Sequence, residues 1–262
     1  MTSVRKPTIL VTNDDGISSA GIRVLWQALK RFADVVVVAP DHNWSAAGHA
    51  KTIHKPLRAE QVTLDPDIEM WTSTGAPSDC VALALNGLIE RPIDLVVSGV
   101  NQGPNLGQDI TYSGTLAAAF EALISGVPAV AVSSMNFKDD EDLMRPAAEF
   151  AARLVEYVWT NQLLNGVVLN VNYPNNGGPR GVQVTRLGRR SYRDKMVKRI
   201  DPRGRPYYWL GGDLLSGDNA EPGTDIRAIR DGYVSITPIH LDMTNYTFLE
   251  KMQSWPLETL LA

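Results

Sequence analysis

Two adjacent carboxylates, Asp14 and Asp15, follow a short apolar segment near the start of the chain and precede Gly16, which permits a tight turn. Adjacent carboxylates repel each other, and a hard divalent cation with oxygen ligands is the simplest way to keep both ionised. A solvated turn that caps the next helix would use the same residues and, taken alone, is the simpler interpretation. The pair is therefore a candidate metal site only if other polar segments converge on it.

Three further polar segments follow predicted strands, at the edge of the sheet where doubly wound α/β proteins bind ligands. Residues 44–49 form a small, polar loop, and residues 98–107 contain three glycines and two asparagines, which offer backbone N–H groups and neutral amides. Residues 111–115 lead into an apolar helix. Ser113 and Thr115 therefore lie near a helix N-terminus, where hydroxyls and free N–H groups can hold phosphate. Ser113 can also be a simple N-cap, and the two roles are compatible.

Several well-known chemistries are disfavoured. The sequence has no Gly-x-x-x-x-Gly-Lys-Ser/Thr motif, and the first predicted strand is not followed by Gly-x-Gly-x-x-Gly. The four histidines show no His-Glu-x-x-His spacing, and Cys80, the one cysteine, can form neither an internal disulfide nor a structural zinc site. A net charge of -4 gives no general attraction to nucleic acid or anionic membrane. Metal chemistry with oxygen ligands remains.

The elements that must position these residues alternate along the first two thirds of the chain. Short β-branched segments and longer amphipathic segments follow each other, as in parallel strands joined by crossover helices. The predicted strands are 8–12, 35–39, 94–98, 129–133 and 167–171, and the predicted helices are about 22–29, 78–88, 115–125 and 140–161. This pattern predicts an α/β fold, a three-layer Rossmann-like arrangement with a mostly parallel central sheet.

The remainder of the chain is richer in Gly, Pro, Arg and aromatic residues. Residues 189–215 are predicted to form a protruding β-hairpin with its turn at 201–204, and residues 232–237 a strand that returns to the main body. We expect a single α/β domain over residues 1–262, with the hairpin used in oligomer contacts. The apolar segment at 9–11 is too short for a signal peptide or membrane span, so the expected location is the cytoplasm.

With these motifs in view, the sequence resembles the SurE family, the stationary-phase survival proteins that act as nucleotidases. The resemblance covers nearly the whole chain and depends most on two long, compositionally unusual segments, 97–107 and 112–115. The other matching segments are 11–16, 38–41 with Ser45, 75–80, 201–204, 223–225 and 232–238.

The resemblance implies a site and a substrate. It implies one divalent metal cation per subunit, Mg²⁺ or Mn²⁺, and a phosphate group beside it; the implied metal ligands are Asp14, Asp15, Ser45 and Asn101, and the implied phosphate-contacting residues are Asn105, Ser113, Gly114 and Thr115. Family members hydrolyse nucleoside 5′- and 3′-monophosphates, some also short polyphosphate, and form homodimers or homotetramers. No nucleic-acid polymer and no membrane is expected as a partner. Many members carry Ser-Gly-x-Ser where this chain has Ser45-Ala46-Ala47-Gly48, so the loop is one departure from the family pattern.

Two mechanisms follow as hypotheses. In the preferred one the metal activates a water molecule for attack on phosphorus, and the catalytic residues are Asp14, Asp15, Asn101, Asn105 and Ser113. In the other, Asp14 or Asp15 is a covalent nucleophile. A nucleotide sensor without turnover would use the same residues. His49 and His240 are candidates for substrate contact, although a structural role is the simpler expectation for each.

Overall fold

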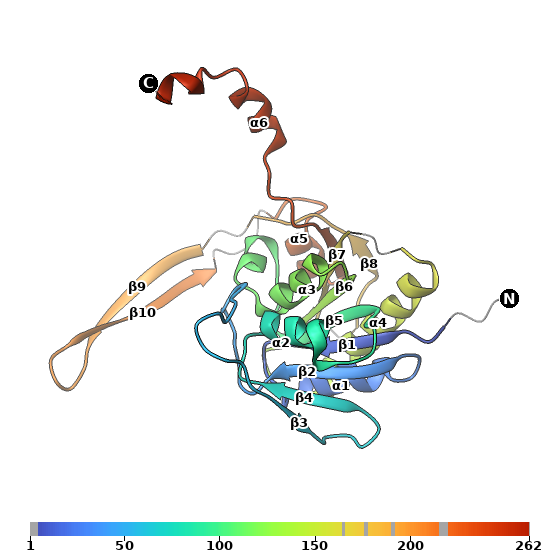
Figure 1. Cartoon of the computed structure of the whole chain (residues 1–262). Helices are drawn as coiled ribbons and strands as arrows, with labels where there is room; N and C mark the ends of the chain where they lie inside the picture. The colour runs from blue at the N-terminus through green and yellow to red at the C-terminus, as the bar shows by residue number, and fades with distance from the viewer. Residues whose placement is uncertain (1–4, 164–165, 176–177, 190–191, 215–219, 262) are drawn as a thin grey trace.

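The central element is a nine-stranded sheet between two layers of helices (Figure 1). The computed structural model describes residues 5–163, 166–175, 178–189, 192–214 and 220–261. The strands follow the order β3-β4-β2-β1-β5-β6-β7-β11-β8 across the sheet. Their bounds are β1 Thr8–Thr12, β2 Asp34–Pro40, β3 Ala59–Val62, β4 Glu69–Ser73, β5 Leu95–Gln102, β6 Ala129–Ser134, β7 Val168–Tyr173, β8 Val182–Val184 and β11 Val234–Ile239.

The helices alternate with these strands in the first two thirds of the chain, as the sequence predicts. The α-helices are α1 Ala20–Leu29, α2 Pro77–Leu83, α3 Gly114–Ile124, α4 Glu141–Thr160, α5 Asp225–Arg230 and α6 Tyr246–Met252, with shorter helical turns at Ala84–Leu88, Gly107–Thr111 and Leu257–Leu261. The helix predicted over 78–88 leaves α geometry after Leu83, because Asn86 and Gly87 have non-helical backbone angles.

The sheet divides the hydrophobic core in two. Alternate residues of one strand face opposite sides, so Ile9 and Val11 of β1 pack with α1 and α4, whereas Leu10 packs with α2 and α3. All three side chains are fully buried. This two-sided burial explains why the strands read as continuous apolar segments, and it confirms the predicted three-layer α/β fold.

Six neighbouring strands, from β4 to β7, run parallel, so their carboxyl ends lie along one edge of the sheet. The exceptions lie at the two sides of the sheet: β3 is antiparallel to β4, and β11, with β8 parallel to it, is antiparallel to β7. The sequence did not reveal β3, β4 or β8. Strands β3 and β8 have only four and three residues and no buried side chain, so they are too short to show the apolar pattern that marks a strand.

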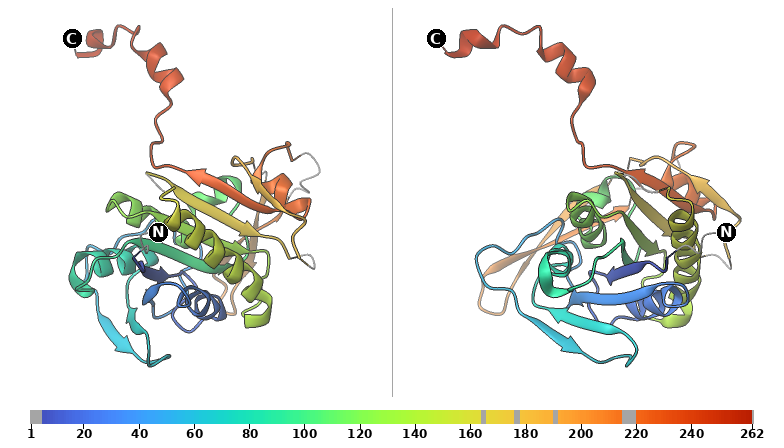
Figure 2. Two further views of the ribbon diagram at one scale, coloured as in Figure 1. Left: turned by 90° about the vertical axis from the view of Figure 1, so that its right-hand side faces the viewer. Right: turned by 45° about the vertical axis from the view of Figure 1, so that its right-hand side comes forward.

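Two segments extend from the main body (Figures 1 and 2). Strands β9, Tyr192–Ile200, and β10, Pro206–Leu214, pair antiparallel in a separate two-stranded sheet. They form the predicted hairpin; residues 190, 191 and 215 of its predicted range lie outside the described residues. The second extension, residues 244–261, carries α6 and is not predicted as a separate feature. None of the helices in the described ranges is long and apolar enough to cross a bilayer.

Candidate active site

The predicted site residues Asp14 and Asp15 lie in the turn directly after β1, and neighbouring side chains build that turn. Asn13 is buried and its side chain bonds Gly16 twice, accepting from the Gly16 N–H at 3.2 Å and donating to the Gly16 carbonyl at 3.1 Å. It also donates to the hydroxyl of Ser19, the N-cap of α1, at 2.8 Å. Gly16 has φ +98°, a conformation that favours glycine. Asn13 is therefore committed to the turn, and the two aspartates are presented to the edge of the sheet.

Asp14 joins three segments that are far apart in the sequence. Its side chain is almost fully buried, and Oδ1 accepts a hydrogen bond of 2.7 Å from the Thr115 hydroxyl in the first turn of α3. Its backbone carbonyl accepts from the Trp44 N–H at 2.7 Å. A Cβ atom on Gly114 would lie 2.7 Å from the Asp14 Cβ, so only glycine permits this close approach. The carboxylate thus lies directly at the N-terminus of α3.

Asp15 contacts the end of β5 and makes a second connection to the loop after β2. Its Oδ2 accepts a hydrogen bond of 3.2 Å from the Gln102 backbone N–H at the end of β5. Its Oδ1 accepts one of 3.2 Å from the side chain of Asn43, whose Oδ1 in turn accepts the Ser45 N–H at 2.7 Å. The loop after β2 is therefore connected to Asp15 through Asn43, a residue that the sequence analysis did not single out.

Burial disfavours the ionised forms of both carboxylates. Desolvation raises the pKa of Asp14, and hydrogen bonds from Thr115 oppose the shift in part. Desolvation and the charge of Asp14 together raise the pKa of Asp15 to about 7. A divalent cation between the two would stabilise both ionised forms.

The donor set is consistent with a hard cation. Within the described residues, no group of three or more His, Cys, Asp or Glu side chains could hold a metal ion. Further ligands would therefore have to be neutral oxygens, which Mg²⁺ and Ca²⁺ sites in proteins commonly include. The Asn101 side chain donates its amide N–H to the Gly103 carbonyl at 2.8 Å and lies beside Gln102, which binds Asp15. Ser45 is exposed, and its connection to Asp15 is the indirect one through Asn43.

Asn105 is held rigidly beneath this edge of the sheet by side chains that the sequence analysis missed. Its N–H donates to Asn172 at 2.8 Å, its carbonyl accepts from Asn170 at 2.9 Å and from Asn172 at 3.0 Å, and its side-chain amide donates to the Ser133 hydroxyl at 2.8 Å. Asn170 and Asn172 alternate with apolar residues in the otherwise buried strand β7. Polar residues within a buried strand are the signal that could have identified them.

The residues predicted to contact phosphate surround the start of α3. Ser113 is the N-cap: its hydroxyl oxygen accepts the Leu116 N–H at 3.1 Å, in agreement with the simpler of its two predicted roles. The Thr115 hydroxyl is directed to Asp14, and the backbone groups of Gly114 and Thr115 also favour the ionised form of Asp14. The carboxylate therefore already uses part of the positive helix end that the sequence analysis assigned to phosphate.

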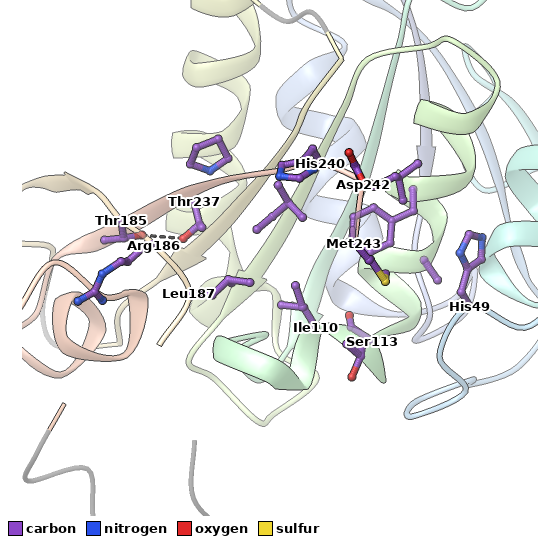
Figure 3. Close-up of a pocket in the computed structure, with 16 residues that line it drawn as sticks. His49, Ile110, Ser113, Thr185, Arg186, Leu187, Thr237, His240, Asp242 and Met243 are labelled. Carbon is purple, nitrogen blue, oxygen red and sulfur yellow. Dashed lines mark hydrogen bonds between the residues drawn. The ribbon is translucent and has the colours of Figure 1, made fainter. Parts of the chain in front are cut away.

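A cavity of about 620 Å³ lies beside α3 and shares Ser113, but not Asp14 or Asp15, with this site (Figure 3). Its lining is mainly apolar and includes Phe120, Leu187 and Met243. His240 also lines it. Because β11 runs antiparallel to β7, the residue after β11 lies at the edge of the sheet opposite to Asp14, and His240 is not part of the carboxylate site.

Comparisons with known proteins agree with this architecture. A family model described as "Survival protein SurE" matches residues 9–194. The chain is 48% identical over 252 residues to a protein named 5′-nucleotidase SurE from Chloroflexus aggregans, covering 95% of this chain and 99% of that relative. It is 46% identical over 249 residues to the protein of the same name from Desulforamulus reducens, covering 94% and 98%. The crystal structure of the SurE protein from Aquifex aeolicus matches with a TM-score of 0.81 and 42% identity, covering 94% of this chain and 98% of that one.

Proposed function

The chain belongs to the SurE family, and we propose that it is a metal-dependent phosphatase that hydrolyses nucleoside 5′-monophosphates, with 3′-monophosphates and short polyphosphate as further substrates. The observation that carries the proposal is the contact between the buried Asp14 carboxylate and Thr115 at the N-terminus of α3. This contact places a pair of carboxylates, which need a cation, against a helix end that attracts an anion. The relatives named 5′-nucleotidase supply the substrate class.

In this proposal Asp14 and Asp15 hold a divalent cation together with Asn101 and Ser45. When bound, Mg²⁺ or Mn²⁺ supplies Lewis acidity toward the phosphoryl oxygens and toward the attacking water. The hydrogen bonds from Thr115 and Gln102 orient the two carboxylates that would hold the cation. Hydrolysis forms a bond between the water oxygen and phosphorus, breaks the phosphate ester bond, and leaves a proton on the nucleoside oxygen.

The residues around the phosphate would stabilise the negative charge that grows on its equatorial oxygens. The Ser113 hydroxyl accepts a hydrogen bond from Leu116 but retains its own proton, which it can donate. The Asn105 side-chain amide has a second N–H besides the one given to Ser133. One well-placed donor of this kind contributes about 2.7 to 4 kcal/mol to transition-state stabilisation.

Covalent catalysis by an aspartate is the alternative chemistry. The burial of Asp14 and its bond to Thr115 favour a ligand role for that residue, because a nucleophile must approach phosphorus directly. Asp15 is less buried and is the better candidate of the two. Acid quench of the enzyme during turnover of radiolabelled phosphoester, followed by a search for label on protein, distinguishes the mechanisms.

The deciding experiment measures phosphate release from a panel of nucleoside 5′- and 3′-monophosphates with Mg²⁺, Mn²⁺ and no metal. We expect release that depends on the cation, disappears with EDTA, and is lost in Asp14→Asn. Binding of nucleotide without phosphate release under any of these conditions would instead identify a sensor. Activity that survives EDTA would contradict the metal site.

We also propose that the chain forms a homodimer or homotetramer through its extensions. A two-stranded hairpin is marginally stable alone in water, and β9–β10 exposes Met196, Ile200 and Trp209, with 60%, 67% and 64% of their surfaces accessible. Apolar residues exposed in such a group are typical of protein contacts.

A further inference from the structure

Glu121 is a buried carboxylate in an apolar helix that the proposed reaction does not use. It lies in α3 between alanine and phenylalanine residues, and its side chain is 5% exposed. Charged residues are rarely buried so fully unless they are paired. Glu121 therefore needs a partner, and the two it has come from outside its own helix.

Both partners belong to the segment of residues 41–58, which joins β2 to β3 and contains no helix or strand. The His49 ring nitrogen Nε2 lies 3.2 Å from Oε2 of Glu121, and the Lys51 ammonium group binds Oε1. His49 and Lys51 are 33% and 50% exposed. The buried acid is thus approached from the surface by two side chains of the same loop.

The loop has further attachments on either side of these residues. The Trp44 N–H donates to the Asp14 carbonyl, and the Gly48 N–H donates to the Tyr112 carbonyl at 3.0 Å. Beyond Lys51, the Thr52 N–H donates to the buried Asp79 at 3.0 Å. Ser45 lies between the first two attachments, so the position of its hydroxyl depends on how firmly the whole segment is held.

Helix α3 connects this attachment to the carboxylate site. Thr115, which binds Asp14, and Glu121 are six residues apart in the same helix, a rise of about 9 Å. One rigid helix therefore holds Asp14 near its first turn and the Ser45 loop farther along. The contacts of Glu121 therefore act together with the direct bond between Trp44 and Asp14 in holding the loop near the carboxylate.

We propose that Glu121 is a positioning residue, whose contacts with Lys51 and His49 fix the loop that carries Ser45 and thereby complete the metal-ligand set of the proposed function. Glu121 does not act on substrate itself, because both of its oxygens are engaged and almost no surface is exposed. The same contact gives His49 a structural role.

The test uses surface variants that leave the helix intact. Lys51→Ala and His49→Ala remove the partners of Glu121, and Lys51→Arg retains the charge. Lys30→Ala is the matched control, because Lys30 binds Asp65 at 2.8 Å with 41% and 13% of the side chains exposed, at an ion pair outside this loop. Glu121→Gln removes the buried charge with little change of shape and therefore tests the Glu121 carboxylate itself.

Two measurements on purified protein decide the proposal. Hydrogen exchange of residues 43–52 without substrate or metal should accelerate in Lys51→Ala and His49→Ala and remain normal in Lys51→Arg and Lys30→Ala. Calorimetric Mn²⁺ binding should weaken roughly tenfold in Lys51→Ala and recover in Lys51→Arg, because partners behind metal ligands typically change affinity by 10- to 100-fold. Unchanged exchange, or faster exchange with unchanged Mn²⁺ affinity, would overturn it.

The result is separable from the outcome for the proposed function. Neither measurement requires turnover, so the loop attachment is tested even if no phosphoester is hydrolysed. Conversely, phosphate release that requires a cation but is indifferent to Lys51→Ala would leave the phosphatase in place and remove Glu121 from its machinery.

Discussion

At the scale of single residues, the site consists of carboxylates whose burial is offset by specific donors. Asp14 accepts a hydrogen bond from the Thr115 hydroxyl, and Asp15 accepts one from the Gln102 N–H. The first donor belongs to α3 and the second to β5. Hydrogen bonds to a buried charge contribute more than those between neutral groups, and removing one leaves the charge poorly solvated. Two predictions follow from this balance.

Thr115→Val retains the shape of the side chain and removes its hydrogen bond to Asp14. We expect a loss of about 1.5 to 3 kcal/mol in the free energy of unfolding, the usual contribution of a hydrogen bond to a charged group. Mn²⁺ affinity should fall roughly 10- to 100-fold. Urea unfolding and calorimetry measure the two effects. The control is Thr111→Val, which removes an exposed hydroxyl that donates to the Gln108 carbonyl. Its free energy of unfolding and its Mn²⁺ affinity should remain close to those of the unsubstituted protein.

The raised pKa of Asp15 predicts how metal-free protein responds to pH. Its pKa is 3.8 when unperturbed and about 7 in the folded chain, so between these values the folded state binds more protons than the unfolded state. The free energy of unfolding should therefore fall as the pH rises from about 4 to about 7. Asp15→Asn should flatten this dependence in urea titrations at several pH values. If the free energy of unfolding changes with pH equally in the variant and in the unsubstituted protein, Asp15 is not the group with the raised pKa.

At the scale of elements, the first turn of α3 is the component that combines the two parts of the site. Its N-cap is Ser113, its second residue binds Asp14, and Gly114 lies where any Cβ would contact the Asp14 side chain. Farther along, the same helix carries Glu121. A displacement of α3 would therefore change the position of Asp14, of the N-cap Ser113 and of the Ser45 loop together.

Gly114→Ala tests this close contact. Alanine is the better helix former at an ordinary helical position, yet here the new Cβ would lie 2.7 Å from the Asp14 Cβ. We expect destabilisation of about 1 to 3 kcal/mol from overpacking, together with loss of Mn²⁺ binding. Thermal unfolding and calorimetry provide the measurements; a more stable variant with normal metal affinity would show that the contact relaxes without cost.

At the scale of the whole molecule, the two extensions expose large apolar side chains among the described residues. The hairpin β9–β10 and the segment 244–261 both project from the main body (Figure 1). Two aromatic residues in and next to α6, Phe248 and Trp255, are 47% and 48% exposed. In the proposed oligomer such surfaces would be covered by another copy of the chain.

Trp209→Lys introduces a charge on the hairpin, and Trp255→Lys does so on the C-terminal segment. If the hairpin forms an oligomer contact, light scattering after size exclusion should show a smaller assembly for Trp209→Lys than for the unsubstituted protein. The Trp255→Lys variant reports separately on the second extension. The same mass for Trp209→Lys at all protein concentrations would exclude the hairpin contact.

The sequence determined much of the fold and which polar segments lie at the carboxyl ends of the parallel strands. Continuous apolar segments such as 95–97 marked buried strands, amphipathic spacing marked helices, and polar residues at strand ends marked the edge where Asp14, Asn101 and Ser113 gather. These are local patterns, set by the two periodicities of backbone structure and by the direction of parallel strands.

The tertiary structure alone decided which side chains meet. The antiparallel direction of β11 places His240 away from the carboxylates, and the pairing of Thr115 with Asp14 spans 101 residues. The partners of Glu121 lie 72 and 70 residues from it. Contacts of this kind arise from how layers pack against each other, and a hydrogen bond between distant residues has no periodicity that a single sequence could display.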